Sequence, residues 1–234
     1  MSEPRLHTVS APADPEGVVL VLHGGRDRGH GPVRANQLAV LRMVPIARRI
    51  TVAGRGRLAV VRLQNRVRGW NGAEQSPVHD ADWAIAELRR RYDPALPLAL
   101  IGHSMGARAA LRVAGRAGVR TVVALAPWLP PGEPTNQLAG RRVLIVHGSA
   151  DRMTSARSSA QFATGLRDVA GSATFVEVPD EKHAMLGRRE VFEELPAGFV
   201  AATLLEPPPA PEGRTASGLV TNLLQRALAG DATL

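Results

Sequence analysis

The sequence predicts a single α/β domain built on a mostly parallel β-sheet with helices on both faces. Short runs of Val, Leu, Ile and Ala alternate along the chain with longer stretches whose apolar residues recur at helical spacing. One such run ends in Gly102-His103-Ser104-Met105-Gly106, and an alanine-rich helical pattern follows it directly. The length of 234 residues suits one domain, and 44% hydrophobic and 21% charged residues are globular values.

The strands are expected where several aliphatic and β-branched residues follow one another. A strand that is covered on both faces has no polar alternation, so it reads as a continuous apolar run. The first expected strand is weaker and suits an edge of the sheet. In chain order the expected strands span residues 6–10, 18–22, 58–63, 98–101, 119–125, 143–146 and 174–178.

Helices are expected between these strands. Pro45 should kink the first helix, and Ser76 should cap the second, with Pro77 at its first position. Because strand and helix alternate, the strands should be parallel. The expected helices span residues 35–50, 77–92, 107–117, 155–169 and 190–204.

The composition changes after residue 204. Residues 206–213 are rich in proline and predict a stiff linker. A short terminal helix then carries an apolar stripe, which we expect to pack back on the domain rather than to bind a partner. The chain thus divides into a domain of residues 1–204 and a tail of residues 205–234. The stripe consists of Leu219, Leu223, Leu224 and Leu228.

The composition also excludes several classes of protein. There is no cysteine, so neither a disulfide nor a thiolate site can form. The net charge is +8, but the cations, all arginine except Lys182, are scattered without interleaved aromatic residues. We therefore do not expect nucleic-acid binding. The chain has neither an apolar leader nor an 18-residue apolar run, which predicts a cytoplasmic protein without a membrane span.

The stretch around Ser104 has the form of a sharp strand-to-helix turn that exposes a nucleophile. Such a turn strains the backbone of the serine and lifts its hydroxyl clear of the sheet. Gly102 and Gly106 would leave room for the close crossing of strand and helix. The alternative is that Ser104 simply caps the following helix.

Two further candidates follow later strands. Asp151 lies in His147-Gly148-Ser149-Ala150-Asp151, and His183 comes shortly after the strand of residues 174–178. The carboxyl ends of parallel strands meet at one edge of a sheet, so these side chains should lie near Ser104. A serine needs a base to take its proton, and the base needs a carboxylate to orient it.

With these residues the sequence resembles the α/β-hydrolase family, from about Val18 to Leu204. The resemblance implies the α/β-hydrolase fold, a Ser104–His183–Asp151 triad, and an oxyanion hole formed by backbone N–H groups. Related enzymes carry a lid between the strands that here end near residue 126 and begin near residue 143. The gap holds only residues 127–142, four of them proline, so no sizeable cap domain is expected. The oxyanion-hole amides implied are those of Gly25 and Met105, with Gly24 or Arg26 as possible substitutes.

The resemblance implies a cofactor-free serine hydrolase that acts on a small-molecule acyl substrate, most simply an ester. Trp128, Trp70 and Arg26 are the candidate substrate contacts. The same triad also serves acyltransferases, thioesterases and perhydrolases. A non-catalytic binding protein that retains the hydrolase fold is the alternative from a different class. The oligomeric state stays open.

The remaining candidates have simpler interpretations. His23 is more suited to bracing its turn than to acting as base, and His103 should point away from the serine hydroxyl. His147 suits a buried, hydrogen-bonded structural role. Asp180 is the next acid to consider after Asp151. The sequence has no close pair of histidines, so we do not expect a metal site.

Overall fold

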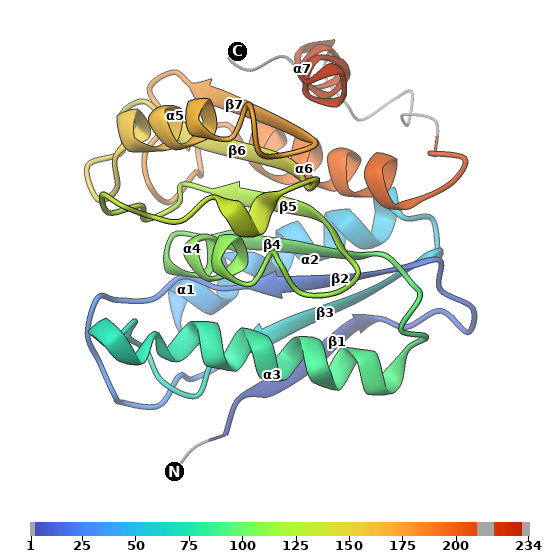
Figure 1. Ribbon diagram of the computed structural model, residues 1–234, viewed down its shortest axis with the longest axis horizontal. Coiled ribbons are helices and arrows are strands. Elements are labelled where there is room, and N and C mark those ends of the chain that lie inside the picture. Colours follow the sequence, from blue (N-terminus) through green and yellow to red (C-terminus); the bar gives the residue numbers. More distant parts are fainter. Residues whose placement is uncertain (1–2, 210–217, 231–234) are drawn as a thin grey trace.

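A seven-stranded sheet in the order β1-β3-β2-β4-β5-β6-β7 forms the centre of the computed structural model, which describes residues 3–209 and 218–230 (Figure 1). β1 runs antiparallel to β3, and every other neighbouring pair is parallel. The edge position of β1 and the parallel core confirm the expected sheet. The strands are β1 (Arg5–Ser10), β2 (Gly17–Leu22), β3 (Leu58–Gln64), β4 (Leu98–His103), β5 (Val119–Leu125), β6 (Arg142–Gly148) and β7 (Ser172–Val178).

Helices cover both faces of the sheet, as Figure 1 shows. One face carries α3 (Ser76–Arg91), α4 (Met105–Arg112) and α5 (Ala156–Gly165). The other face carries α2 (Met43–Ala53) and α6 (Arg189–Leu204), with α1 (Leu38–Leu41) and α7 (Gly218–Ala229) beside them. Successive side chains of β2 enter the two apolar layers in turn, because side chains alternate across a strand. This alternation explains why the central strands are aliphatic throughout.

Two helix predictions differ from the structure. Residues 35–50 form two helices, α1 and α2, which meet at Arg42. Pro45 therefore lies in the first turn of α2, where backbone N–H groups have no partner within the helix. Its lack of an N–H costs no hydrogen bond there, and it does not kink a longer helix. Ser76 is the first helical residue of α3 rather than its cap, and its hydroxyl donates to Glu74.

No lid covers the carboxyl edge of the sheet in the described part of the chain. Between β5 and β6 the backbone forms only one short 3-10 helix, η2 (Asn136–Leu138). The long loop after β3 contains another, η1 (Gly72–Glu74). The expectation of a domain without a cap is therefore confirmed. None of the described helices combines the length and the apolar character that crossing a membrane would require.

The terminal helix α7 lies against α6. Val220 and Ala227 are buried there, while the carbonyl of Leu228 accepts a hydrogen bond of 3.2 Å from Arg142 in β6. Of the predicted apolar stripe, Leu223, Leu224 and Leu228 pack against the domain as expected, but Leu219 lies on the free side of the helix and is 47% exposed, so its packing was predicted wrongly. Residues 210–213 of the expected linker lie outside the described residues. The carbonyls of Glu206 and Pro207 are held by Arg57 at 2.9 and 3.0 Å.

Two adjacent residues of α7 allow a matched test of this packing. Val220→Asp should lower the melting temperature, because burial of a valine side chain contributes about 1.5–3 kcal/mol. For a domain of this size, that corresponds to about 3–12 °C. Leu219→Asp introduces the same charge on the exposed side and should change the melting temperature by less than about 2 °C. Equal melting temperatures for the two variants, measured by calorimetry, would contradict the packing of α7.

Candidate active site

Ser104 occupies a strained turn between β4 and α4. Its backbone has φ 55° and ψ −117°, a region that residues with a Cβ rarely adopt. The hydroxyl makes no capping bond to α4, so the interpretation of Ser104 as a helix cap is wrong. The strain instead serves to turn the side chain out of the strand direction.

The two glycines of the turn are required by close backbone crossings. A Cβ on Gly102 would stand 2.3 Å from the carbonyl oxygen of Gly106. A Cβ on Gly106 would stand 2.4 Å from the carbonyl oxygen of His23, at the end of β2. Both distances are shorter than any side chain tolerates, which confirms that only glycine fits at these positions.

The loops after β6 and β7 bring Asp151 and His183 together. Oδ2 of Asp151 lies 2.7 Å from Nδ1 of His183. A carboxylate only accepts, so Nδ1 carries the hydrogen and Nε2 is left as the basic nitrogen of the ring. Ser104 Oγ makes no hydrogen bond to any described residue, and such bonds are often long until a substrate is bound.

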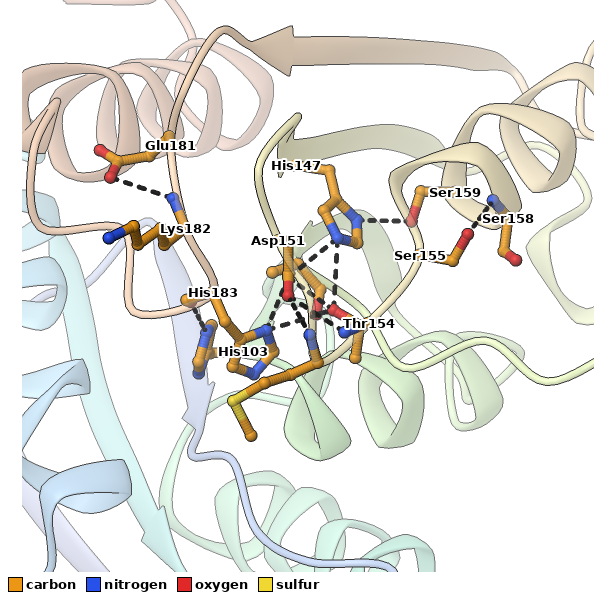
Figure 2. Close-up of polar contacts among 12 residues, drawn as sticks. His103, His147, Asp151, Thr154, Ser155, Ser158, Ser159, Glu181, Lys182 and His183 are labelled. Atoms are coloured by element: carbon orange, nitrogen blue, oxygen red, sulfur yellow. Dashed lines mark hydrogen bonds and ion pairs between the residues drawn. The ribbon is translucent and has the colours of Figure 1, made fainter.

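Sequence reasoning missed two further partners of Asp151, both visible in Figure 2, where His147, Thr154 and His183 converge on its carboxylate. His147 Nε2 lies 3.1 Å and Thr154 Oγ1 2.7 Å from Oδ2. Nδ1 of His147 then accepts from the hydroxyl of Ser159 at 2.8 Å. His147 is fully hydrogen-bonded, as predicted, but one of its partners is the candidate acid, and its position four residues before Asp151 was the available signal.

These contacts keep Asp151 ionised. Burial raises the pKa of the carboxyl, but the hydrogen bonds from His183, from Thr154 and from the amide of Met153 outweigh burial and lower the pKa to about 2. Burial also lowers the pKa of His147, against the influence of Asp151. The carboxylate is therefore the negatively charged partner of the group, beside a neutral second imidazole.

The segment that carries His183 is held by two side chains from other parts of the chain and by Glu181 within the segment itself. His103 Nε2 donates to the carbonyl of His183 at 2.9 Å. Arg42 donates to the carbonyls of Ala184 and Met185, both at 2.8 Å. The buried carboxylate of Glu181 accepts from the amides of residues 182, 187 and 188. His103 thus anchors the segment that carries His183, a contact that spacing could not reveal.

Gly25 and Met105, the candidate oxyanion-hole residues, come from the loop after β2 and from the start of α4. A Cβ on Gly25 would touch the side chain of Met105 at 2.4 Å, so these residues are direct neighbours. Met105 begins α4, where amides have no helical partner. Among the described residues, neither amide has an acceptor. The amide of Arg26 already donates to the carbonyl of Arg68 at 2.9 Å, which removes Arg26 from the possible donors.

His23 braces this loop. Its Nε2 accepts from the amide of Asn65 at 3.1 Å, so Nδ1 carries the hydrogen and donates to the carbonyl of Gly24 at 2.6 Å. Burial lowers the pKa of His23 to about 4, although the bond to Gly24 opposes this. Both ring nitrogens are thus occupied, and His23 is not placed to act as a base.

The candidate substrate contacts differ in exposure. Trp70 is only 3% exposed, so its ring packs in the apolar layer rather than forming an open wall. Trp128 is half-buried and meets Trp70 edge to face, with ring centroids 5.9 Å apart. Arg26 is exposed. Within the described residues, no three His, Asp or Glu side chains are grouped in a way that could hold a metal ion.

Comparisons with known proteins agree on the architecture. No protein-family model matches the sequence, and no curated protein matches it. Solved structures do: esterase 2 of Thermogutta terrifontis has a TM-score of 0.63 at 15% identity and covers 87% of this chain and 89% of its own. Est1E of Butyrivibrio proteoclasticus, solved with ferulic acid bound, has a TM-score of 0.61 at 14% identity over 86% of this chain and 95% of its own.

A third solved structure has the same fold. A serine hydrolase of Xanthomonas campestris, described as having no lid, has a TM-score of 0.58 at 20% identity. The match covers 90% of this chain and 98% of that protein. With the sheet order and the turn at Ser104, these likenesses show that the chain has the α/β-hydrolase fold, in the form without a lid.

Proposed function

We propose that the protein is a cofactor-free serine hydrolase that cleaves carboxylic esters through Ser104, His183 and Asp151. The single observation that carries the proposal is the 2.7 Å hydrogen bond between His183 and an ionised Asp151. The loop of His183 is anchored by His103, which directly precedes the strained Ser104. Two solved neighbours of the same fold are esterases, which favours an ester as substrate.

In this mechanism Ser104 Oγ attacks the ester carbonyl carbon while Nε2 of His183 takes its proton. The amides of Met105 and Gly25 donate to the oxyanion that forms. The tetrahedral intermediate collapses to an acyl-enzyme, and the alcohol leaves with the proton from His183. Water then attacks the acyl group with His183 as base, and the acid leaves. Asp151 stabilises the imidazolium in both halves.

Ser104→Ala should abolish ester hydrolysis, with kcat reduced by about 10⁴-fold or more, because no other activated nucleophile stands at this turn. The melting temperature should be unchanged. Ser158→Ala, a serine on α5 away from the turn, is the matched control and should keep the wild-type rate. A rate above a few per cent of wild type in Ser104→Ala would show that the nucleophile is another residue.

A fluorophosphonate probe distinguishes the hydrolase from a non-catalytic binding protein. The probe should label the wild-type protein at Ser104, identified by peptide mass spectrometry, because labelling needs an activated serine. The Ser104→Ala protein should stay unlabelled. A folded wild-type protein that fails to react would favour the binding protein.

Asp151→Asn should reduce kcat on the order of 10⁴-fold with little change in KM, since an amide no longer stabilises the imidazolium or selects its tautomer. Asp180→Asn removes an exposed carboxylate only three residues from His183 and serves as the control. Steady-state kinetics of both variants make the comparison. Should Asp180→Asn lose activity while Asp151→Asn keeps it, the assignment of the acid is wrong.

The pH dependence of kcat/KM should show one ionisation. The rate should fall as the pH falls, because a protonated His183 cannot accept the proton of serine. His23 and His103 should stay neutral between about pH 5 and 8, since burial lowers their pKa values to about 4 and about 3. Asp151, with its pKa of about 2, should stay ionised. A logarithmic slope of one supports the proposal, whereas a level profile or a slope of two contradicts it.

A further inference from the structure

Arg108 is a buried cation one turn beyond Ser104 that the proposed mechanism does not use. It is 8% exposed and lies on α4. Its guanidinium carbon stands 3.8 Å from the ring centroid of Trp70 and 4.6 Å from that of Trp128. Two indole rings in contact with one guanidinium hold its charge in place by cation–π attraction.

The guanidinium is only partly satisfied. Its Nε donates to Glu133, whose two carboxylate oxygens also accept from Arg112 at 2.6 and 3.2 Å. In residues 3–209 and 218–230, no acceptor is bonded to either terminal nitrogen of Arg108, and solvent touches both of them. Two arginines share one carboxylate, so the group carries a net charge of +1 in a mostly buried position.

Backbone hydrogen bonds tie Arg108 and both indole residues to the segments around Ser104. The carbonyl of Ser104 accepts from the amides of Arg108 at 3.1 Å and Trp128 at 3.3 Å. The amide of Trp70 donates to the carbonyl of Arg26, in the loop that also holds Gly25. Helical side chains lean toward the N-terminus of their helix, which for α4 is the end occupied by Ser104.

The electrostatics agree with this location. Burial lowers the pKa of Arg108, whereas the charges of Glu133 and Asp27 raise it. Asp27 is an exposed residue of the loop after β2, two positions beyond Gly25. An exposed carboxylate of the loop that holds Gly25 thus contributes to the electrostatic surroundings of Arg108.

We propose that Arg108 recognises a second, ionised carboxylate on the substrate, so that the enzyme prefers half-esters of dicarboxylic acids or esters whose alcohol part carries a carboxylate. The proposal rests on the proposed serine hydrolase. Four N–H donors in a planar fork match the geometry of a carboxylate. The apolar stem of such a substrate would lie against the indole of Trp128, which is half-buried.

The first experiment compares pairs of substrates that differ only in charge. On the acyl side these are mono-4-nitrophenyl glutarate and its methyl ester; on the alcohol side, 3-acetoxybenzoate and its methyl ester. Wild-type kcat/KM should favour the anion in at least one pair by about 10-fold or more, the usual strength of a charged hydrogen bond. Wild-type protein that prefers the neutral ester in both pairs, or shows no preference, would overturn the proposal.

Variants then assign the preference to one residue. Arg108→Gln should reduce the anion-to-neutral ratio by about 10-fold or more, and Arg108→Lys should restore part of it because the charge remains. Arg116→Gln removes the same charge from an exposed arginine paired with Asp82 and should leave the ratio unchanged. If Arg26→Gln removes the preference instead of Arg108→Gln, the carboxylate is bound at the mouth and the proposal is wrong.

A binding measurement separates this proposal from the proposed function. Glutarate should quench the indole fluorescence of the wild-type protein in a saturable manner, because Trp70 and Trp128 adjoin Arg108. The effect should be lost in Arg108→Gln and should need no turnover. If glutarate binds in this way while no ester is cleaved, the anion site stands and the hydrolase fails. If esters are cleaved but glutarate binding does not depend on Arg108, the anion site fails.

Discussion

The close crossing of β4, α4 and β2 is the constraint on which the rest of the site depends. The backbone of Gly106 passes so near the end of β2 that no side chain fits between them, and Gly102 meets the first turn of α4 in the same way. The chain can make this crossing only if Ser104 adopts a positive φ. The strained serine is therefore a consequence of packing in the whole sheet, and the free energy of burying the two apolar layers holds it there.

The same edge of the sheet is stiffened by hydrogen bonds to backbone carbonyls. The carbonyl of His183 accepts from His103 at the end of β4, and the carbonyls of residues 184 and 185 both accept from Arg42, between α1 and α2. His23 does the equivalent for the loop after β2. His23 and His103 are buried, so breaking one of their bonds leaves an unsatisfied group out of water, which costs about 1–3 kcal/mol. A site without a lid cannot rely on closure for its geometry, so fixed loops of this kind replace the ordering that a lid would supply.

The parts of the molecule that could be predicted are those that follow from the spacing of apolar residues and from the order of the elements along the chain. A strand covered on both faces reads as an aliphatic run, so the strands and their alternation with helices follow from the sequence. Ser104, Asp151 and His183 stand out because each follows a strand. The contact of His103 was not predictable, because it depends on how the loop after β7 folds toward the end of β4 rather than on spacing. Trp70 could not be distinguished from an open cleft wall for the same reason: its ring is covered by Arg108, on α4, and by Trp128, in the loop after β5.

The charges around Ser104 are arranged asymmetrically. The loop after β6 supplies an ionised Asp151, which contacts His183 in the loop after β7. Arg108 and Arg112 on α4 share the carboxylate of Glu133 and together with it carry a net positive charge. Burial keeps His23 and His103 uncharged, with pKa values of about 4 and about 3, so they add nothing to either side. In the proposed mechanism, the proton taken from serine moves onto the ring that the negative Asp151 orients. In the further proposal, the negative charge of the substrate is bound by the arginine pair, where four guanidinium N–H groups have no protein acceptor among the described residues.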